Sequence, residues 1–121
     1  MNTEEIAKRL VSLCRKGQNT LAQVELYDDD IESIESLKSR LRKTKGIKKV
    51  QQKTAMFFEM TQKIHEYKIS EPLIAGNFVT LKMYIDVTLR GVGRIKLEEL
   101  CLYHTKNGKI IKEEFYYIPS F

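Results

Sequence analysis

The chain has 121 residues, of which 42% are hydrophobic and 31% charged, and its formal net charge is +5. This length fits one domain with one core, and no uncharged run is long enough for a membrane-spanning helix. Residues 1–5 show neither the basic nor the apolar segment of a secretory signal. Two cysteines, Cys14 and Cys101, exclude a disulfide framework and a cysteine-based metal cluster, so we expect a cytoplasmic protein.

The positive charge is concentrated in one stretch. Residues 36–58 carry eight basic residues and no acid, so this stretch has a charge of +8 and the remainder −3. We call it the basic segment, and its members are Lys38, Arg40, Arg42, Lys43, Lys45, Lys48, Lys49 and Lys53. It contains no recognition motif and no stacking aromatic residue, so nucleic-acid binding is not expected. The alternatives are a solvated loop and helix face, or an anion-attracting rim beside a pocket.

The first half of the chain predicts three helices and a short strand. Thr3, followed by two acids, predicts the cap of a first helix that ends at residues 16–17. A second helix starts at Asn19 or Thr20, with Leu21 and Val24 on its buried face. Residues 31–35 predict a strand, and Gly46 precedes a third helix. The buried stripe of that helix is Ile47, Val50, Thr54, Phe57 and Thr61.

The second half predicts an antiparallel meander. Apolar and polar residues alternate strictly from Val79 to Arg90, which is typical of a strand with one buried face. The expected strands cover residues 64–75, 78–90, 94–106 and 109–118, and Asn107-Gly108 is the preferred pair for a tight hairpin. The predicted fold class is therefore α+β: three N-terminal helices packed on a strongly curved, mainly antiparallel sheet.

Three short patterns carry a family resemblance: Lys-Gly-Gln at residues 16–18, Leu-Tyr-Asp-Asp-Asp-Ile at 26–31 and Asn-Gly-Lys-Ile at 107–110. Together with the order of the elements, they make the chain resemble the SnoaL-like branch of the nuclear transport factor two-like superfamily, which has a cystatin-like fold. The resemblance implies a single domain over residues 1–121, shaped as a cone around a ligand-sized pocket. The superfamily includes isomerases, cyclases, dehydratases and binding modules, so the fold alone does not give the function.

Strand alternation predicts which side chains face the helices. With Val79 to Leu89 inward, the Asn107-Gly108 hairpin turns Glu99, Cys101 and Tyr103 inward on the next strand. On the last strand the inward residues are Ile111, Glu113, Phe115 and Tyr117. The predicted ligand contacts are Tyr103, Glu113, Phe115, Tyr117, Met83, Phe57 and Cys101. The opposite face carries Leu100, Leu102, Tyr116 and Ile118, so we expect a homodimer through the outer sheet face.

Carboxylates in this apolar interior are candidate general bases, because burial raises their pKa. The candidates are Glu99 and Glu35, the latter at the position where the resemblance places the aspartate that is the catalytic base of ketosteroid isomerases. Glu35 has an alternative role as the partner of a lysine in the basic segment. A one-residue shift in register would exchange Glu99 for Glu98, or Glu113 for Glu114. The isomerases' oxyanion donors correspond to Leu10 and Cys101 here, so Tyr103 or Tyr117 would have to replace them.

Three functions are consistent with the sequence. The first is a small-molecule-binding protein with a semi-apolar pocket and an anionic or apolar ligand. The second is a cofactor-independent isomerase, cyclase or dehydratase that uses Glu35 or Glu99 as general base. The third is an interaction module that holds an anionic partner through the basic segment. We expect no metal, because His65 and His104 lie in no metal-ligand motif.

Overall fold

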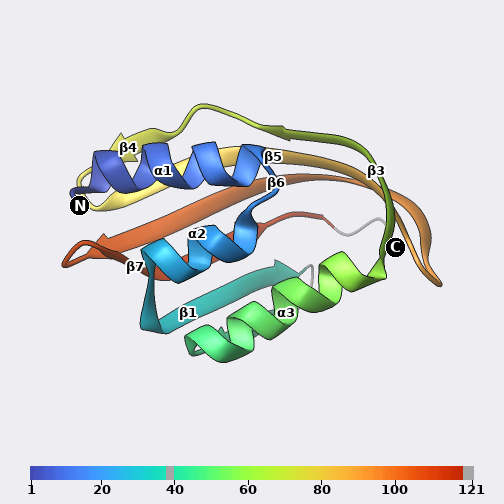
Figure 1. Cartoon of the computed structure of the whole chain (residues 1–121), viewed down its shortest axis with the longest axis horizontal. Coiled ribbons are helices and arrows are strands. Elements are labelled where there is room, and N and C mark those ends of the chain that lie inside the picture. Colours follow the sequence, from blue (N-terminus) through green and yellow to red (C-terminus); the bar gives the residue numbers. More distant parts are fainter. Residues whose placement is uncertain (38–39, 119–121) are drawn as a thin grey trace.

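The computed structural model describes residues 1–37 and 40–118. Its three helices lie over one face of a curved sheet, as the sequence predicts (Figure 1). The helices are α1 (Thr3–Arg15), α2 (Asn19–Leu26) and α3 (Ile47–Met60). The strands are β1 (Tyr27–Leu37), β2 (Arg40–Lys45), β3 (Thr61–Ile69), β4 (Leu73–Ala75), β5 (Phe78–Leu89), β6 (Gly93–Lys106) and β7 (Lys109–Tyr116). No helix in these described ranges has both the length and the apolar character needed to cross a bilayer.

The sheet is mixed, with the strand order β2-β1-β7-β6-β5-β3 and β4 paired to β5. The predicted four-stranded meander is present, because β3 and β4 pair with β5, β5 with β6 and β6 with β7, all antiparallel, whereas β1 joins β7 in parallel. The strand expected over residues 64–75 is divided into β3 and β4, and Pro72 lies in the interruption, since proline cannot donate a ladder hydrogen bond. The strand β2 was not predicted, because its largely basic sequence hides any apolar alternation. Lys38, a member of the basic segment, lies outside the described residues.

Two predicted helix details are wrong. Asn2, not Thr3, caps α1, because its side chain accepts from the Glu5 amide and Glu5 binds back in a capping box. On α2, Leu21 and Val24 are 41% and 60% exposed. The buried residues there are Ala22, Gln23 and Leu26, because contacts with α1 and α3 select a different face of this short helix.

The predicted strand faces are confirmed with one exception. Every second residue of β5 from Val79 to Leu89 is buried, and Glu113 on β7 is 2% exposed. Near the hairpin, however, Ile110 is fully buried and Ile111 is not. A register shift pairs His104 with Lys112 but Thr105 with Ile110, so Ile111 is the extra residue of a bulge. Counting from the turn therefore fails at this bulge and is correct beyond it.

Candidate functional site

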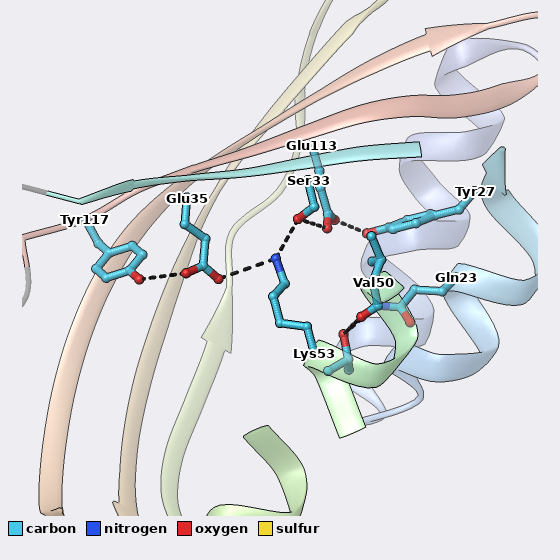
Figure 2. A network of polar contacts seen from close by, with 9 residues as sticks. Gln23, Tyr27, Ser33, Glu35, Val50, Lys53, Glu113 and Tyr117 are labelled. Atoms are coloured by element: carbon cyan, nitrogen blue, oxygen red, sulfur yellow. Dashed lines mark hydrogen bonds and ion pairs between the residues drawn. The ribbon is translucent and has the colours of Figure 1, made fainter. Parts of the chain in front are cut away.

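A chain of polar contacts crosses the inner face of the sheet (Figure 2). The parallel pairing of β1 with β7 places Ser33 beside Glu113, and α3 supplies Lys53 from above. Lys53 Nζ donates to Ser33 Oγ at 2.7 Å, and Ser33 Oγ donates to Glu113 Oε2 at 2.6 Å. Glu113 Oε1 accepts a further hydrogen bond from the Tyr27 hydroxyl. The buried carboxylate thus has a partner on each oxygen.

The same lysine extends the chain toward the end of β7. Lys53 Nζ lies 3.5 Å from Glu35 Oε1, and the Tyr117 hydroxyl donates to Glu35 Oε2 at 3.2 Å (Figure 2). The alternative role foreseen for Glu35, as the partner of a lysine in the basic segment, is therefore confirmed. Lys53 also lies 5.7 Å from the centre of the Phe115 ring, a distance suited to a cation–π contact. The Lys53 ammonium group thus contacts residues of β1 and β7, and through Glu35 it is linked to Tyr117 just beyond β7.

Burial raises the pKa of Glu113, while its hydrogen bonds from Ser33 and Tyr27 and the charge of Lys53 act in the opposite direction. The pKa of Tyr27 is raised well above its usual value, first by burial and then by the charge of Glu113. Tyr27 therefore remains a neutral donor at physiological pH. The Tyr27–Glu113–Ser33 group lies in the core, and its chemistry is that of a positioned hydrogen-bond network.

Glu99 differs from Glu113 because it lies near the surface without a partner. Residue parity on β6 turns Glu99 inward, whereas Glu98 points outward, is 68% exposed and pairs with Lys82 at 3.3 Å. Burial raises the pKa of Glu99 to about 7; the charge of Glu35 adds to this rise and that of Lys53 opposes it. Within the described chain no hydrogen bond or ion pair joins the Glu99 carboxylate to another side chain. Glu99 is therefore the inner carboxylate that can exchange a proton near neutral pH.

An open hollow of about 810 Å³ begins at Glu99 and Tyr117. It lies where β7 ends, beside the pair Leu100–Tyr116, and from there β6 continues with no strand paired to it on that side among the residues the structure describes. Its other lining residues are Ser36, Lys82, Lys96, Glu98, Leu100, Tyr116 and Ile118. A smaller hollow of about 290 Å³, between α1 and the interruption before β4, includes Lys8, Arg15 and Glu71 and touches none of the inner network.

The remaining predicted ligand contacts are divided between the network and the core. Phe115 and Phe57 are partly buried and pack against the core. Three others are buried: Tyr103 at 3% exposure, Cys101 at 0% and Met83 at 8%. Burial also raises the pKa of the Cys14 thiol to about 12, so Cys14 is an inert core residue. Leu10, at the position of a family oxyanion donor, is likewise buried in the core.

The sequence interpretation missed Tyr27, Ser33 and Lys53 as members of one network. Lys53 was counted as part of the surface charge, yet it follows the buried Val50 by three residues, which places both on one side of α3. That spacing was the available signal. The other members of the basic segment whose side chains the structure describes point outward: Arg42, Lys45, Lys48 and Lys49 are exposed, and Lys43 pairs with Glu32 at 3.3 Å.

The two histidines lie apart from the inner network. His65 Nε2 bonds Thr88 Oγ1 at 2.7 Å, and His104 Nε2 bonds Glu114 Oε1 at 3.0 Å. In the part of the chain that the structure covers, no three His, Cys, Asp or Glu side chains are arranged to hold a metal ion.

Comparison with known proteins identifies the family. The model of the SnoaL-like domain matches residues 1–117. This chain belongs to the SnoaL-like domain family. A SnoaL-like protein from Mesorhizobium loti, named as a candidate polyketide cyclase, is 33% identical, with coverage of 97% of this chain and 100% of that one and a TM-score of 0.88. The comparison with curated proteins found no match.

More distant solved structures share the fold of this SnoaL-like domain. A cystatin-like protein of unknown function from Xanthomonas campestris is 17% identical over 97% of this chain and 91% of that one, with a TM-score of 0.78. A ketosteroid isomerase-like protein from Catenulispora acidiphila, solved with trimethylamine, is 20% identical over 98% and 89%, with a TM-score of 0.74. The resemblance and the fold class predicted from the sequence are thus confirmed.

Proposed function

We propose that this SnoaL-like domain binds a small molecule in the hollow beside Glu99 and Tyr117. One observation carries the proposal: Tyr117 lines the hollow and also donates to Glu35, so a single side chain links the hollow with the inner polar network. The volume of about 810 Å³ lies within the range of roughly 300–1,000 Å³ that is usual for ligand sites. The lining combines apolar side chains with a few polar groups, as such sites do.

A fragment titration followed by NMR tests this proposal. We expect a panel of small aromatic fragments to shift the backbone amide signals of residues 99–101 and 116–118 in the ¹⁵N-labelled chain. Leu100→Lys, which places a charge on the wall of the hollow, should weaken these shifts. Ser12→Lys is the matched control, because Ser12 lines the smaller hollow. Fragments that bind only beside Lys8 and Arg15 would contradict the proposal.

A second candidate is a proton-transfer enzyme of the cyclase, isomerase or dehydratase class, with Glu99 as general base. It is favoured by the pKa of about 7 at Glu99, which allows the carboxylate to take up and return a proton near neutral pH. Glu35, the other predicted base, is engaged by Lys53 and Tyr117, so we give it a supporting role. The similarity to the candidate polyketide cyclase of Mesorhizobium loti is consistent with this class. Tyr117 is the donor nearest the hollow for a developing oxyanion.

The titration of Glu99, followed by the ¹³C signal of its carboxylate, tests the second candidate. We expect a midpoint near 7, and a still higher midpoint in Lys53→Met, because the charge of Lys53 lowers the pKa of Glu99. Lys48→Met, on the exposed side of the same helix, should leave the midpoint where it is. A midpoint near 4.5 in the unmodified protein would remove the reason for assigning Glu99 as a base.

We also propose that a second copy covers the outer sheet face in solution. Leu100, Tyr116 and Ile118 are 58%, 42% and 79% exposed there. The same side chains wall the outer half of the hollow, so in the dimer the second copy would close the hollow on that side around the bound ligand. Opposite charges alternate on this face, as in the Lys82–Glu98 pair, so a like copy meets no excess of one sign. Sedimentation at about 100 μM protein should show a dimer that Leu100→Glu dissociates, and a monomeric unmodified chain would contradict this proposal.

A further inference from the structure

The inner end of the hollow is marked by one carboxylate. The described inner face carries the charged groups Lys53, Glu35, Glu99 and Glu113, and of these only Glu99 lines the hollow. Lys53 already binds Ser33 and Glu35, and Glu113 already accepts two hydroxyl hydrogen bonds. Glu99 has neither kind of partner, so a carboxylate at the wall of the hollow remains available to a ligand.

The hydroxyl groups of the inner network are already in use. The Tyr117 hydroxyl donates to Glu35, and the Ser33 and Tyr27 hydroxyls donate to Glu113. Because an unpaired, partly buried carboxylate is unfavourable, Glu99 favours a ligand that brings its own donors.

The outer half of the hollow has a different character. Leu100, Tyr116 and Ile118 give it an apolar wall, Lys82 is already paired with Glu98, and the ammonium group of Lys96 is exposed at the rim. No described member of the basic segment lines either hollow. Among the described residues, the charge at the inner wall of the hollow is the Glu99 carboxylate.

We propose that the ligand of this hollow is an amine, whose protonated nitrogen pairs with the Glu99 carboxylate while its apolar body contacts Leu100, Tyr116 and Ile118. This inference rests on the proposed function, because it names the ligand class of the same hollow. An ammonium group supplies both the donors and the positive charge that the inner wall lacks. An anionic ligand would instead lie beside an unpaired carboxylate.

Binding of an amine should depend on pH with a definite sign. Glu99 titrates near 7, so it is mostly protonated at about pH 6 and mostly ionised at about pH 8. The ammonium pairs with the ionised form, so affinity should rise about tenfold over this interval. The groups that face Glu99 are Glu35 from β1, Glu113 from β7, Lys53 from α3, Tyr67 from β3 and Tyr117, with Lys82, Lys96 and Glu98 at the outer rim. Burial raises the pKa of Tyr67 to about 12 and also raises that of Tyr117, so both tyrosines stay neutral in this range.

Three probes of nearly equal shape test the inference: benzylamine, benzyl alcohol and benzoate, titrated into the ¹⁵N-labelled chain at about pH 6 and pH 8. We expect benzylamine to bind about tenfold more tightly than benzyl alcohol at pH 8, with benzoate weakest. Glu99→Gln should remove this preference and its pH dependence while retaining the binding of benzyl alcohol. Glu59→Gln, which changes an exposed carboxylate on α3 that lines neither hollow, should retain both.

The outcomes separate this inference from the function on which it rests. Equal binding of benzylamine and benzyl alcohol at the hollow, without pH dependence, would overturn the amine and leave the small-molecule site in place. Tightest binding of benzoate would overturn it in favour of an anion. Absence of all three probes from residues 99–101 and 116–118 would overturn both. The pH dependence of the unmodified protein decides the question even if Glu99→Gln does not fold.

Discussion

Glu113 and Glu114 are neighbours on β7 and carry the same side chain, yet the sheet places them in opposite surroundings. Glu113 points toward the helices, is 2% exposed and has its pKa raised by burial. Glu114 points to the outer face, where the Tyr116 hydroxyl, then His104 and Lys112, hold its pKa below the usual range. Adjacent glutamates on one strand thus have pKa values shifted in opposite directions, because alternate side chains lie on opposite faces of the sheet, one buried and one polar.

The same contrast holds for Glu98 and Glu99 on β6, but with a functional difference. Both carboxylate oxygens of Glu113 accept hydrogen bonds, one from Tyr27 and one from Ser33. Glu99 has no hydrogen-bond donor among the described side chains, and it borders the hollow. Inward orientation is therefore necessary but not sufficient for a binding role. A carboxylate on this face is available to a ligand only where β7 has ended and the neighbouring strand no longer covers it.

Replacement of Glu113, the inward glutamate of β7, should cause the largest loss of stability. Glu113→Ala leaves the Tyr27 and Ser33 hydroxyls without their acceptor in the core, so we expect a loss of about 3 kcal/mol in the free energy of unfolding at pH 7. The matched outer variant, Glu114→Ala, should cost about 1 kcal/mol. Urea denaturation measures both values, and equal losses would show that the two faces do not differ as described.

Removal of the central ammonium group should have the next largest effect. Lys53→Met leaves Ser33 and Glu35 without their shared cation, and we expect a loss of about 2 kcal/mol, also measured by urea denaturation. Lys48→Met on the solvent side of α3 should change stability by less than about 0.5 kcal/mol. A similar loss in the two variants would mean that Lys53 acts only through general charge.

Glu99→Gln should stabilise the protein above neutral pH. The folded state holds a proton on Glu99 up to about pH 7, whereas the unfolded chain releases it near 4.5. The favourable contribution of this proton is complete below 4.5 and is lost as pH rises to 7. We therefore expect the variant to be more stable than the unmodified protein by about 2 kcal/mol at pH 8 and nearly equal to it at pH 4. Thermal unfolding across this range measures the difference, and the control Glu98→Gln should not reproduce the gain.

Glu114→Gln on the outer face should change the stability with a pH dependence opposite in sign to that of Glu99→Gln and smaller in size. The lowered pKa of Glu114 contributes stability above its unfolded value near 4.5, and this contribution is lost as pH falls through the lower folded value. Glu114→Gln should therefore cost about 1 kcal/mol at pH 7, and the difference should vanish in acid. The same thermal measurements check it, and a stabilising effect at pH 7 would contradict the contrast between the faces.

The parts of the site that could be predicted are those fixed by strand parity. The unbroken pairing from Phe78–His104 to Leu89–Gly93 makes each inward residue of β5 meet an inward residue of β6, which decides Glu99 over Glu98. Ile111 was misplaced because a bulge changes parity without any clear sequence signal. Lys53 was misplaced because a lysine is ordinarily a surface residue, and only the nearby carboxylates explain its inward orientation.

The sequence by itself determined the fold class and the inward faces of β5 and β6, because these depend on local periodicity and turn chemistry, and its resemblance to SnoaL-like proteins indicated the family. The tertiary structure alone decided that the Glu113 carboxylate is hydrogen-bonded on both oxygens and that Glu99 borders the hollow. That choice depends on where β7 ends and on the parallel pairing of β1 with β7, contacts between residues about 80 positions apart, such as Ser33 and Glu113. Local sequence carries no information on such pairing, because the free energy that selects it comes from burial of the whole sheet.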